Sequence, residues 1–176
     1  MFMYLSFMLT VMSIFIMAAY VAGVCIEIKG VPPSISATFF KLKHRFWFTA
    51  TMWSVSLLLI YPIIMVSKPH TTIAAIIAMV GLFLVGAAPN FTDKHQRKIH
   101  ITGATSSLIG SQIWVGLNLP LLLLAWNAYI LYTIIAMSVQ KQGTFTERFL
   151  RTNPLFWIEI LALSTTYATI FIKLFE

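Results

Sequence analysis

Residues 2–26 read FMYLSFMLTVMSIFIMAAYVAGVCI, a run without a charged side chain. It is longer than the roughly 20 apolar residues that an α-helix needs to cross a bilayer, and longer than the apolar core of a signal peptide. No basic residue precedes it. The run therefore predicts a transmembrane helix that is retained in the protein.

The rest of the chain has the same character. Of its 176 residues, 59% are hydrophobic and 10% are charged, and the mean hydropathy is +0.87. This composition excludes an ordinary soluble domain, because too few polar side chains remain to cover a surface. The net charge of +7 comes from basic residues in small groups beside apolar segments, which is typical of membrane loops. We therefore expect membrane lipids as partners, and no nucleic acid.

Apolar windows of spanning length recur along the chain between charges, prolines and polar clusters. They predict an all-α integral membrane protein, a single domain over residues 1–176 that forms a bundle of about six transmembrane helices. The predicted helices cover residues 2–26, 46–67, 71–89, 100–117, 120–139 and 154–174. One helix over 100–139 would be about 60 Å long, twice the hydrocarbon thickness. Pro120 also disfavours helical geometry at Leu119, so a tight hairpin is expected there.

The basic residues are distributed unevenly between alternate loops. Three loops hold ten of the twelve, namely Lys29, Lys41, Lys43, Arg45, Lys94, Arg97, Lys98, Lys141, Arg148 and Arg151. The opposite side holds only Lys68 and Lys173. Because short cytoplasmic loops are enriched in Lys and Arg, both termini are predicted on the non-cytoplasmic side of a cell membrane, such as a bacterial inner membrane.

The first basic loop contains more than a linker. A pair of prolines ends any helix there, Ser34 is a candidate N-cap, and Ile35, Phe39 and Leu42 recur at i, i+4 and i+7. Two interpretations remain open. The segment is either an amphipathic piece lying in the membrane interface or a basic extension of the helix at 46–67.

Polar side chains inside a span are costly unless they are paired or face water, so they are the candidate functional residues. On the helix at 100–117, one side carries His100, Gly103, Ala104, Ser107, Ser111 and Trp114. Small residues at this spacing predict a packing seam, with a polar groove as the alternative. Asn127 in the next helix is predicted to form an interhelical hydrogen bond.

Glu159 is the one acidic residue well inside a predicted span. We expect it to point inward and to meet His44, Arg45 or His100 at the cytoplasmic end of the bundle. Together with these, Asp93 and His95 complete a candidate polar cluster of imidazoles and carboxylates. No fixed-spacing metal or catalytic signature accompanies the cluster, so no catalytic residue and no metal ligand is assigned, and no cofactor is required.

The passage with Gly81, Gly86-Ala87-Ala88-Pro89-Asn90, His100 and Gly103-Ala104 resembles a bacterial six-helix membrane family of unknown function allied to the DRAM and Frag membrane proteins. The resemblance covers residues 80–115. It implies a six-helix bundle and no particular activity.

Three classes of function remain. The favoured one is a non-enzymatic membrane protein that binds or senses lipid, or supports a membrane-protein partner or a second copy of itself. The second is a small transporter or channel lined by Glu159, Asn127 and the groove of the helix at 100–117. The third is a lipid-modifying, metal or haem enzyme that uses the polar cluster, with His44 and His100 as the candidate haem ligands.

Overall fold

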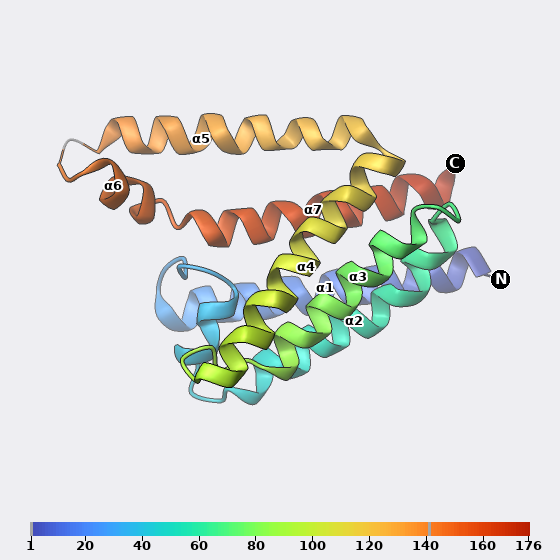
Figure 1. The fold of residues 1–176 in the computed structure, drawn as a ribbon, viewed down its shortest axis with the longest axis horizontal. Coiled ribbons are helices and arrows are strands. Elements are labelled where there is room, and N and C mark those ends of the chain that lie inside the picture. Colours follow the sequence, from blue (N-terminus) through green and yellow to red (C-terminus); the bar gives the residue numbers. More distant parts are fainter. Residues whose placement is uncertain (1, 141) are drawn as a thin grey trace.

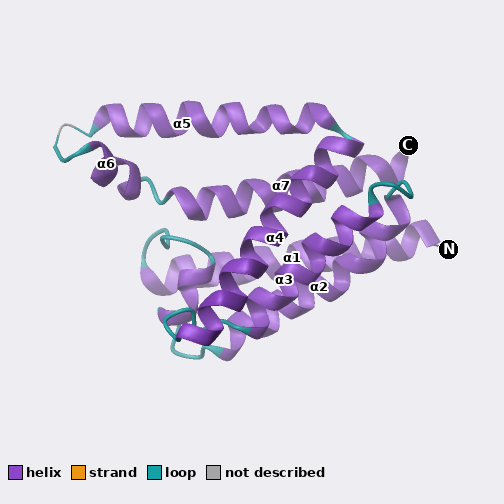
Figure 2. Ribbon diagram, viewed as in Figure 1, coloured by secondary structure: helices purple, strands orange, loops and turns teal. Residues whose placement is uncertain are grey.

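The structure is a computed structural model that describes residues 2–140 and 142–176. Every regular element in these ranges is helical (Figure 2). In chain order they are α1 Phe2–Ile28, η1 Ser36–Phe40, α2 Phe46–Val66, α3 Thr72–Ala87, α4 Lys94–Asn118, η2 Pro120–Leu124, α5 Ala125–Val139, α6 Phe145–Arg151 and α7 Pro154–Phe175, where η denotes a 3-10 helix. Lys141, one of the ten basic residues counted above, lies outside the described residues.

Six long segments run back and forth between two ends of the molecule, and both termini lie at the same end (Figure 1). The segments are α1, α2, α3, α4, η2 with α5, and α7. Their bounds agree with the predicted helices to within two residues, except that α4 begins at Lys94 and not at residue 100. The reason is Asp93, whose carboxylate accepts the N–H groups of His95 and Gln96 and so caps a basic first turn.

Four of the segments are long and apolar enough to cross a membrane, namely Phe2–Ile28, Phe46–Val66, Pro120–Val139 and Pro154–Phe175. In α1, polar side chains are buried and apolar side chains are exposed, which is the reverse of the distribution in a soluble bundle. Helix α1 buries the hydroxyls of Ser6, Thr10 and Ser13, whereas Phe2 and Phe15 are 62% and 73% exposed. Buried hydroxyls and exposed aromatic rings are compatible with a protein whose solvent is lipid.

Helices α3 and α4 pack closely because two glycines face each other. A Cβ atom on Gly81 would lie 2.5 Å from the backbone N of Ser107 and 2.6 Å from the carbonyl O of Gly103. A Cβ atom on Gly103 would lie 2.7 Å from the carbonyl O of Gly81. Only glycine leaves room for this approach, and it lets the backbones of α3 and α4 come into contact.

The chain breaks between α4 and η2 as the predicted hairpin requires. Leu119 has an extended φ of −142°, and Pro120 begins the 3-10 turn η2. Helix α5 then runs along the edge of the molecule (Figure 1) and is the least buried of the four apolar segments. The short helix α6 was not predicted, although Thr144 and Glu147 form a capping box whose spacing is visible in the sequence.

Candidate functional site

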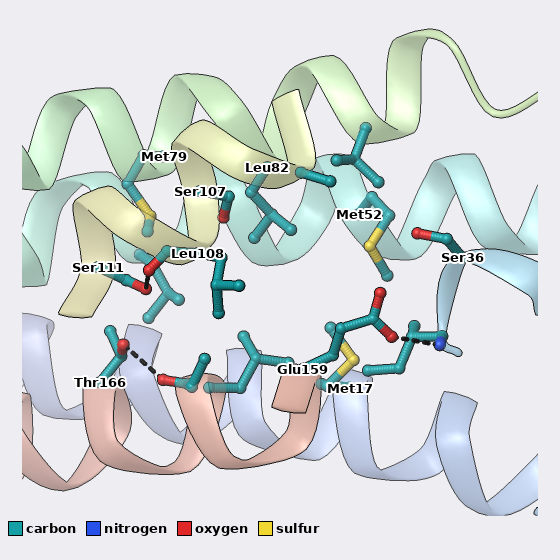
Figure 3. Close-up of a pocket in the computed structure, with 16 residues that line it drawn as sticks. Met17, Ser36, Met52, Met79, Leu82, Ser107, Leu108, Ser111, Glu159 and Thr166 are labelled. Carbon is teal, nitrogen blue, oxygen red and sulfur yellow. Dashed lines mark hydrogen bonds between the residues drawn. The ribbon is translucent and has the colours of Figure 1, made fainter. Parts of the chain in front are cut away.

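An internal cavity lies where five helices and η1 meet (Figure 3). Its volume is about 80 Å³, measured as the space open to the centre of a water molecule. The apolar wall includes three methionines, Met17 from α1, Met52 from α2 and Met79 from α3. Hydroxyl groups come from Ser107 and Ser111 on α4 and Thr166 on α7.

The one charged side chain of the cavity is Glu159 on α7, five residues after the helix begins at Pro154. Its Oε2 accepts the backbone N–H of Ile35 at 2.5 Å. Ser36, the next residue, also lines the cavity beside the carboxylate (Figure 3). Glu159 therefore lies at the end of the cavity nearest to the basic loops.

Residues 31–40, the η1 segment, bring this N–H group to the carboxylate. Carbonyl groups of Val31 and Pro33 accept hydrogen bonds from Asn153 Nδ2 and Phe156 N at the start of α7. The Ser34 hydroxyl accepts the N–H of Ala37, although the capping position of η1 is Ile35 and not the predicted Ser34. The η1 segment is thus docked on the first turn of α7, whose free N–H groups need acceptors.

The apolar side of the η1 segment faces the protein interior. Ile35 and Phe39 are buried, and the Thr38 hydroxyl pairs with that of Tyr20 on α1. The segment is separate from α2, which begins at Phe46, so the interpretation as an extension of α2 is wrong. The amphipathic pattern is present, and its apolar residues Ile35 and Phe39 are buried against the bundle.

Among the described residues, none forms the expected ion pair with Glu159. Throughout the part of the chain that the structure describes, the only salt bridge joins Lys173 to Glu176. His44 is exposed, and the guanidinium of Arg45 lies 5.3 Å from the ring centre of Phe39. A backbone N–H group takes the place that a basic side chain was expected to fill.

The other members of the predicted polar cluster are also apart from Glu159. His100 is buried, with Nδ1 2.9 Å from the carbonyl O of Ala88 and its ring against Phe91, so it holds the turn between α3 and α4. His95 is exposed beside Asp93. The N–H groups of Gln96 and His95, with the nearby imidazole, hold the pKa of Asp93 below its usual value.

Metal and haem interpretations receive no support from this placement. Within residues 2–140 and 142–176, no three His, Cys, Asp or Glu side chains converge as a metal site would require. His44 is exposed, whereas His100 is buried against Ala88 and Phe91, so the two imidazoles do not present themselves as a ligand pair.

The predicted seam residues divide into two groups. Gly103 and Ser107 lie at the close contact between α3 and α4. Ser107 and Ser111 line the cavity. The same side of α4 therefore contributes to the helix contact and to the cavity wall. Asn127 belongs to neither. It is exposed on α5, and no hydrogen-bond partner for it exists among the described residues, so the expected interhelical bond is not formed.

Gln112 is the polar residue that the sequence analysis missed. Its Oε1 accepts from Trp126 Nε1 at 3.0 Å and from the Thr165 hydroxyl at 3.2 Å. Its Nε2 donates to the carbonyl of Ala162 at 3.3 Å. This one side chain of α4 therefore connects α5 to α7. Its partners lie 14 to 53 positions away in the sequence, so no local pattern reveals them.

Comparison with protein-family models, with curated proteins and with solved structures finds no match to this chain.

Proposed function

We propose that the chain is a six-span membrane protein that binds a small amphiphile in this cavity, with Glu159 holding a head group that is positively charged or rich in hydrogen-bond donors. The observation that carries the proposal is a single carboxylate at one end of a mostly apolar cavity. Among the described residues, the hydrogen-bond donors beside it come from Ile35 and Ser36 of the η1 segment, and no basic side chain pairs with it.

The membrane arrangement rests on two arguments. Helices α3 and α4 have 16 and 25 residues, about 24 and 38 Å of helix, so the pair reaches across most or all of a 30 Å hydrocarbon layer. The basic loops lie at the end opposite to the termini (Figure 1), which favours cytoplasmic loops and outward termini in a cell membrane.

The chemistry of the cavity favours a ligand with donors. A carboxylate has about four lone-pair positions, and the donors of Ile35 and Ser36 do not fill all of them. Burying a carboxylate without a partner is costly, and a bound ammonium or hydroxyl group would reduce that cost. The head group would therefore lie beside Glu159 and Ser36.

The apolar wall favours a tail on the same ligand. Methionine side chains are unbranched and adapt to irregular shapes, so Met17, Met52 and Met79 suit a flexible hydrocarbon chain. One water needs about 10–15 Å³ by the same measure, so the cavity has room for several waters or for a short stretch of chain. An amphiphile with one chain fits both ends of the cavity.

The proposal can be tested with a saturated single-chain primary amine that carries a photoreactive diazirine next to its head. With the protein in lipid nanodiscs, the probe should label peptides from α7 and the η1 segment. Glu159→Gln should reduce labelling by about tenfold or more, because a charge-assisted hydrogen bond contributes about 1.5–3 kcal/mol. Glu147→Gln, in α6, is the matched control and should label like the native protein.

A second probe with the same chain and a carboxylate head should label these peptides far less than the amine. Equal labelling by the two probes would show that Glu159 does not select the head group. Labelling by the amine that survives Glu159→Gln would contradict the proposal.

A further inference from the structure

A second hollow lies on the outside of α4, in the groove between α4, η2 and the start of α5. Its walls are almost entirely apolar and include Ile113, Gly116, Leu117 and Leu123. Leu108 lines both this groove and the internal cavity. Among the described residues, Leu108 is the one that the two linings share, so the two hollows approach each other at its side chain.

We propose that the cavity and the groove are two halves of one site for a single-chain membrane lipid, whose tail passes Leu108 and lies in the groove while its head stays at Glu159. This inference rests on the proposed function. It adds the class of ligand, a lipid that resides in the membrane, and the route by which that lipid enters, sideways between α4 and α5.

The length of the combined path agrees with such a tail. Along α4 the two linings run from Ala104 to Leu117. At 1.5 Å per residue this is about 20 Å of helix. One leaflet of a bilayer is about 15 Å of hydrocarbon, so the path accommodates a lipid chain of ordinary length.

The groove is suited to the tail and not to the head. Its polar side chains are Gln112 and Trp126, and they are bonded to each other. The remaining amide group of Gln112 donates to the carbonyl of Ala162. Because these groups already have partners, the groove offers apolar surface, and the carboxylate in the cavity is the place for a polar head.

Passage from groove to cavity requires only a local movement. Leu108 is partly buried, and its side chain changes position by rotation about two bonds. On the groove side, Gly116 leaves space that a side chain would fill, since a Cβ atom there would meet only the Leu123 side chain, at 3.0 Å. A substitution at residue 116 therefore fills the groove without a collision between backbones.

The experiment uses two probes with the same amine head and the same chain, one with its diazirine next to the head and one with it at the chain end. In the native protein the first should label α7 and the η1 segment, and the second should label residues 113–126. Gly116→Leu should abolish labelling by the chain-end probe at residues 113–126. Leu108→Trp, which blocks the passage, should have the same effect.

Ile101→Trp is the matched control, because Ile101 is exposed on the same helix and lines neither hollow. It should leave both labelling patterns unchanged. If the head probe labels α7 in a Glu159-dependent way but the chain-end probe labels residues 52–85 instead of 113–126, the inference is wrong and the proposed function stands. If the head probe fails to label α7 at all, the proposed function fails first.

Discussion

Gly81 illustrates how one missing methyl group sets a helix contact. Its absent Cβ atom would lie within 2.6 Å of two backbone atoms of α4, and backbone atoms cannot rotate away as a side chain can. We expect Gly81→Ala to push α3 and α4 apart and to lower the free energy of unfolding by about 1–3 kcal/mol, the usual range for overpacking. A thermal unfolding midpoint measured in detergent should fall accordingly.

Gly23 provides the control for this substitution. It also lies in a helix, but a Cβ atom there would meet nothing within 4 Å. Gly23→Ala should be neutral or raise stability by about 0.5–1 kcal/mol, because alanine restricts the unfolded chain. Equal losses at residues 23 and 81 would show that the close contact of α3 and α4 is not what requires glycine.

Asp93 gives a prediction for pH. Its pKa is held below the usual value by the N–H groups of Gln96 and His95, which favour the ionised form in the folded state. Its contribution to stability is therefore complete above the unfolded-state pKa and is lost as the pH falls through the folded-state pKa. The thermal midpoint of the native protein should exceed that of Asp93→Asn at neutral pH.

The difference between these two midpoints should shrink on acidification, because the asparagine side chain caps the helix without a charge that can be titrated. Comparing the two proteins removes the effects of the other carboxylates, which titrate in both. A difference that is constant with pH would assign the stabilisation by Asp93 to its shape and not to its charge.

At the scale of elements, Gln112 decides how α5 is attached. Gln112→Leu keeps the size of the side chain but leaves Trp126 Nε1 without its acceptor, so we expect a loss of about 1–3 kcal/mol. Trp126→Phe should lower stability in the native background and change it little when residue 112 is already leucine. Additive losses in this double-mutant cycle would show that the bond between α4 and α5 is not the cause.

Asn127 lies one residue further along α5 and should behave in the opposite way. It is exposed on the apolar outer face, and no partner for it exists within the described residues. Asn127→Leu should therefore leave the thermal midpoint unchanged or raise it, because an amide facing lipid is unfavourable. A clear loss would indicate a hydrogen-bond partner outside this copy of the chain, such as a second copy.

The positions of the helices could be predicted from the sequence, whereas the partners of their polar side chains could not. Long apolar windows and prolines are local signals, and they placed most helix ends to within two residues. Glu159 instead binds a backbone N–H at Ile35, more than a hundred positions away, and a backbone donor has no signature in the sequence. Gln112 was missed for the same reason, since its role depends on how α5 and α7 pack.

Two further helix starts have local signals in the sequence. Thr144 and Glu147 have the spacing of a capping box, and they start α6. Asp93 precedes a basic turn without apolar residues, so hydropathy alone predicts a start of α4 that is too late. Helix ends outside lipid are determined by capping, and hydropathy reports only the part of a helix that is apolar.

For the whole molecule, the distribution of polar groups argues for lipid on the outside. Hydroxyl groups form hydrogen bonds across helices: Ser56 donates to the carbonyl of Met79, and the hydroxyls of Ser13 and Tyr167 bond to each other. Large apolar side chains cover the outer surface of the described helices. Such a bundle would aggregate in water, and in lipid its small and polar residues supply the contacts that hold helices together.

The number of spans is the property of the whole molecule that a single experiment can decide. Four segments meet the length and hydropathy of a span without further argument, and α3 and α4 are the pair that makes the difference between four and six. With either four or six spans, reporter fusions after residues 29 and 145 should indicate the cytoplasm. Fusions at residue 70 and at the carboxyl terminus should indicate the exterior with either number. The fusion after residue 92 separates them, because it is cytoplasmic only if α3 and α4 both cross.

We expect the fusion at residue 92 to report the cytoplasm for two independent reasons. Lys94, Arg97 and Lys98 follow directly, and short basic loops remain on the cytoplasmic side. The turn after α3 also lies at the same end of the molecule as the other two basic loops, opposite to both termini (Figure 1).

An exterior signal at residue 92 with the expected signals elsewhere would mean four spans, with α3 and α4 forming a hairpin that does not cross. Reversed signals at residues 29 and 70 would instead overturn the orientation, and with it the placement of the Glu159 end of the cavity near the cytoplasm.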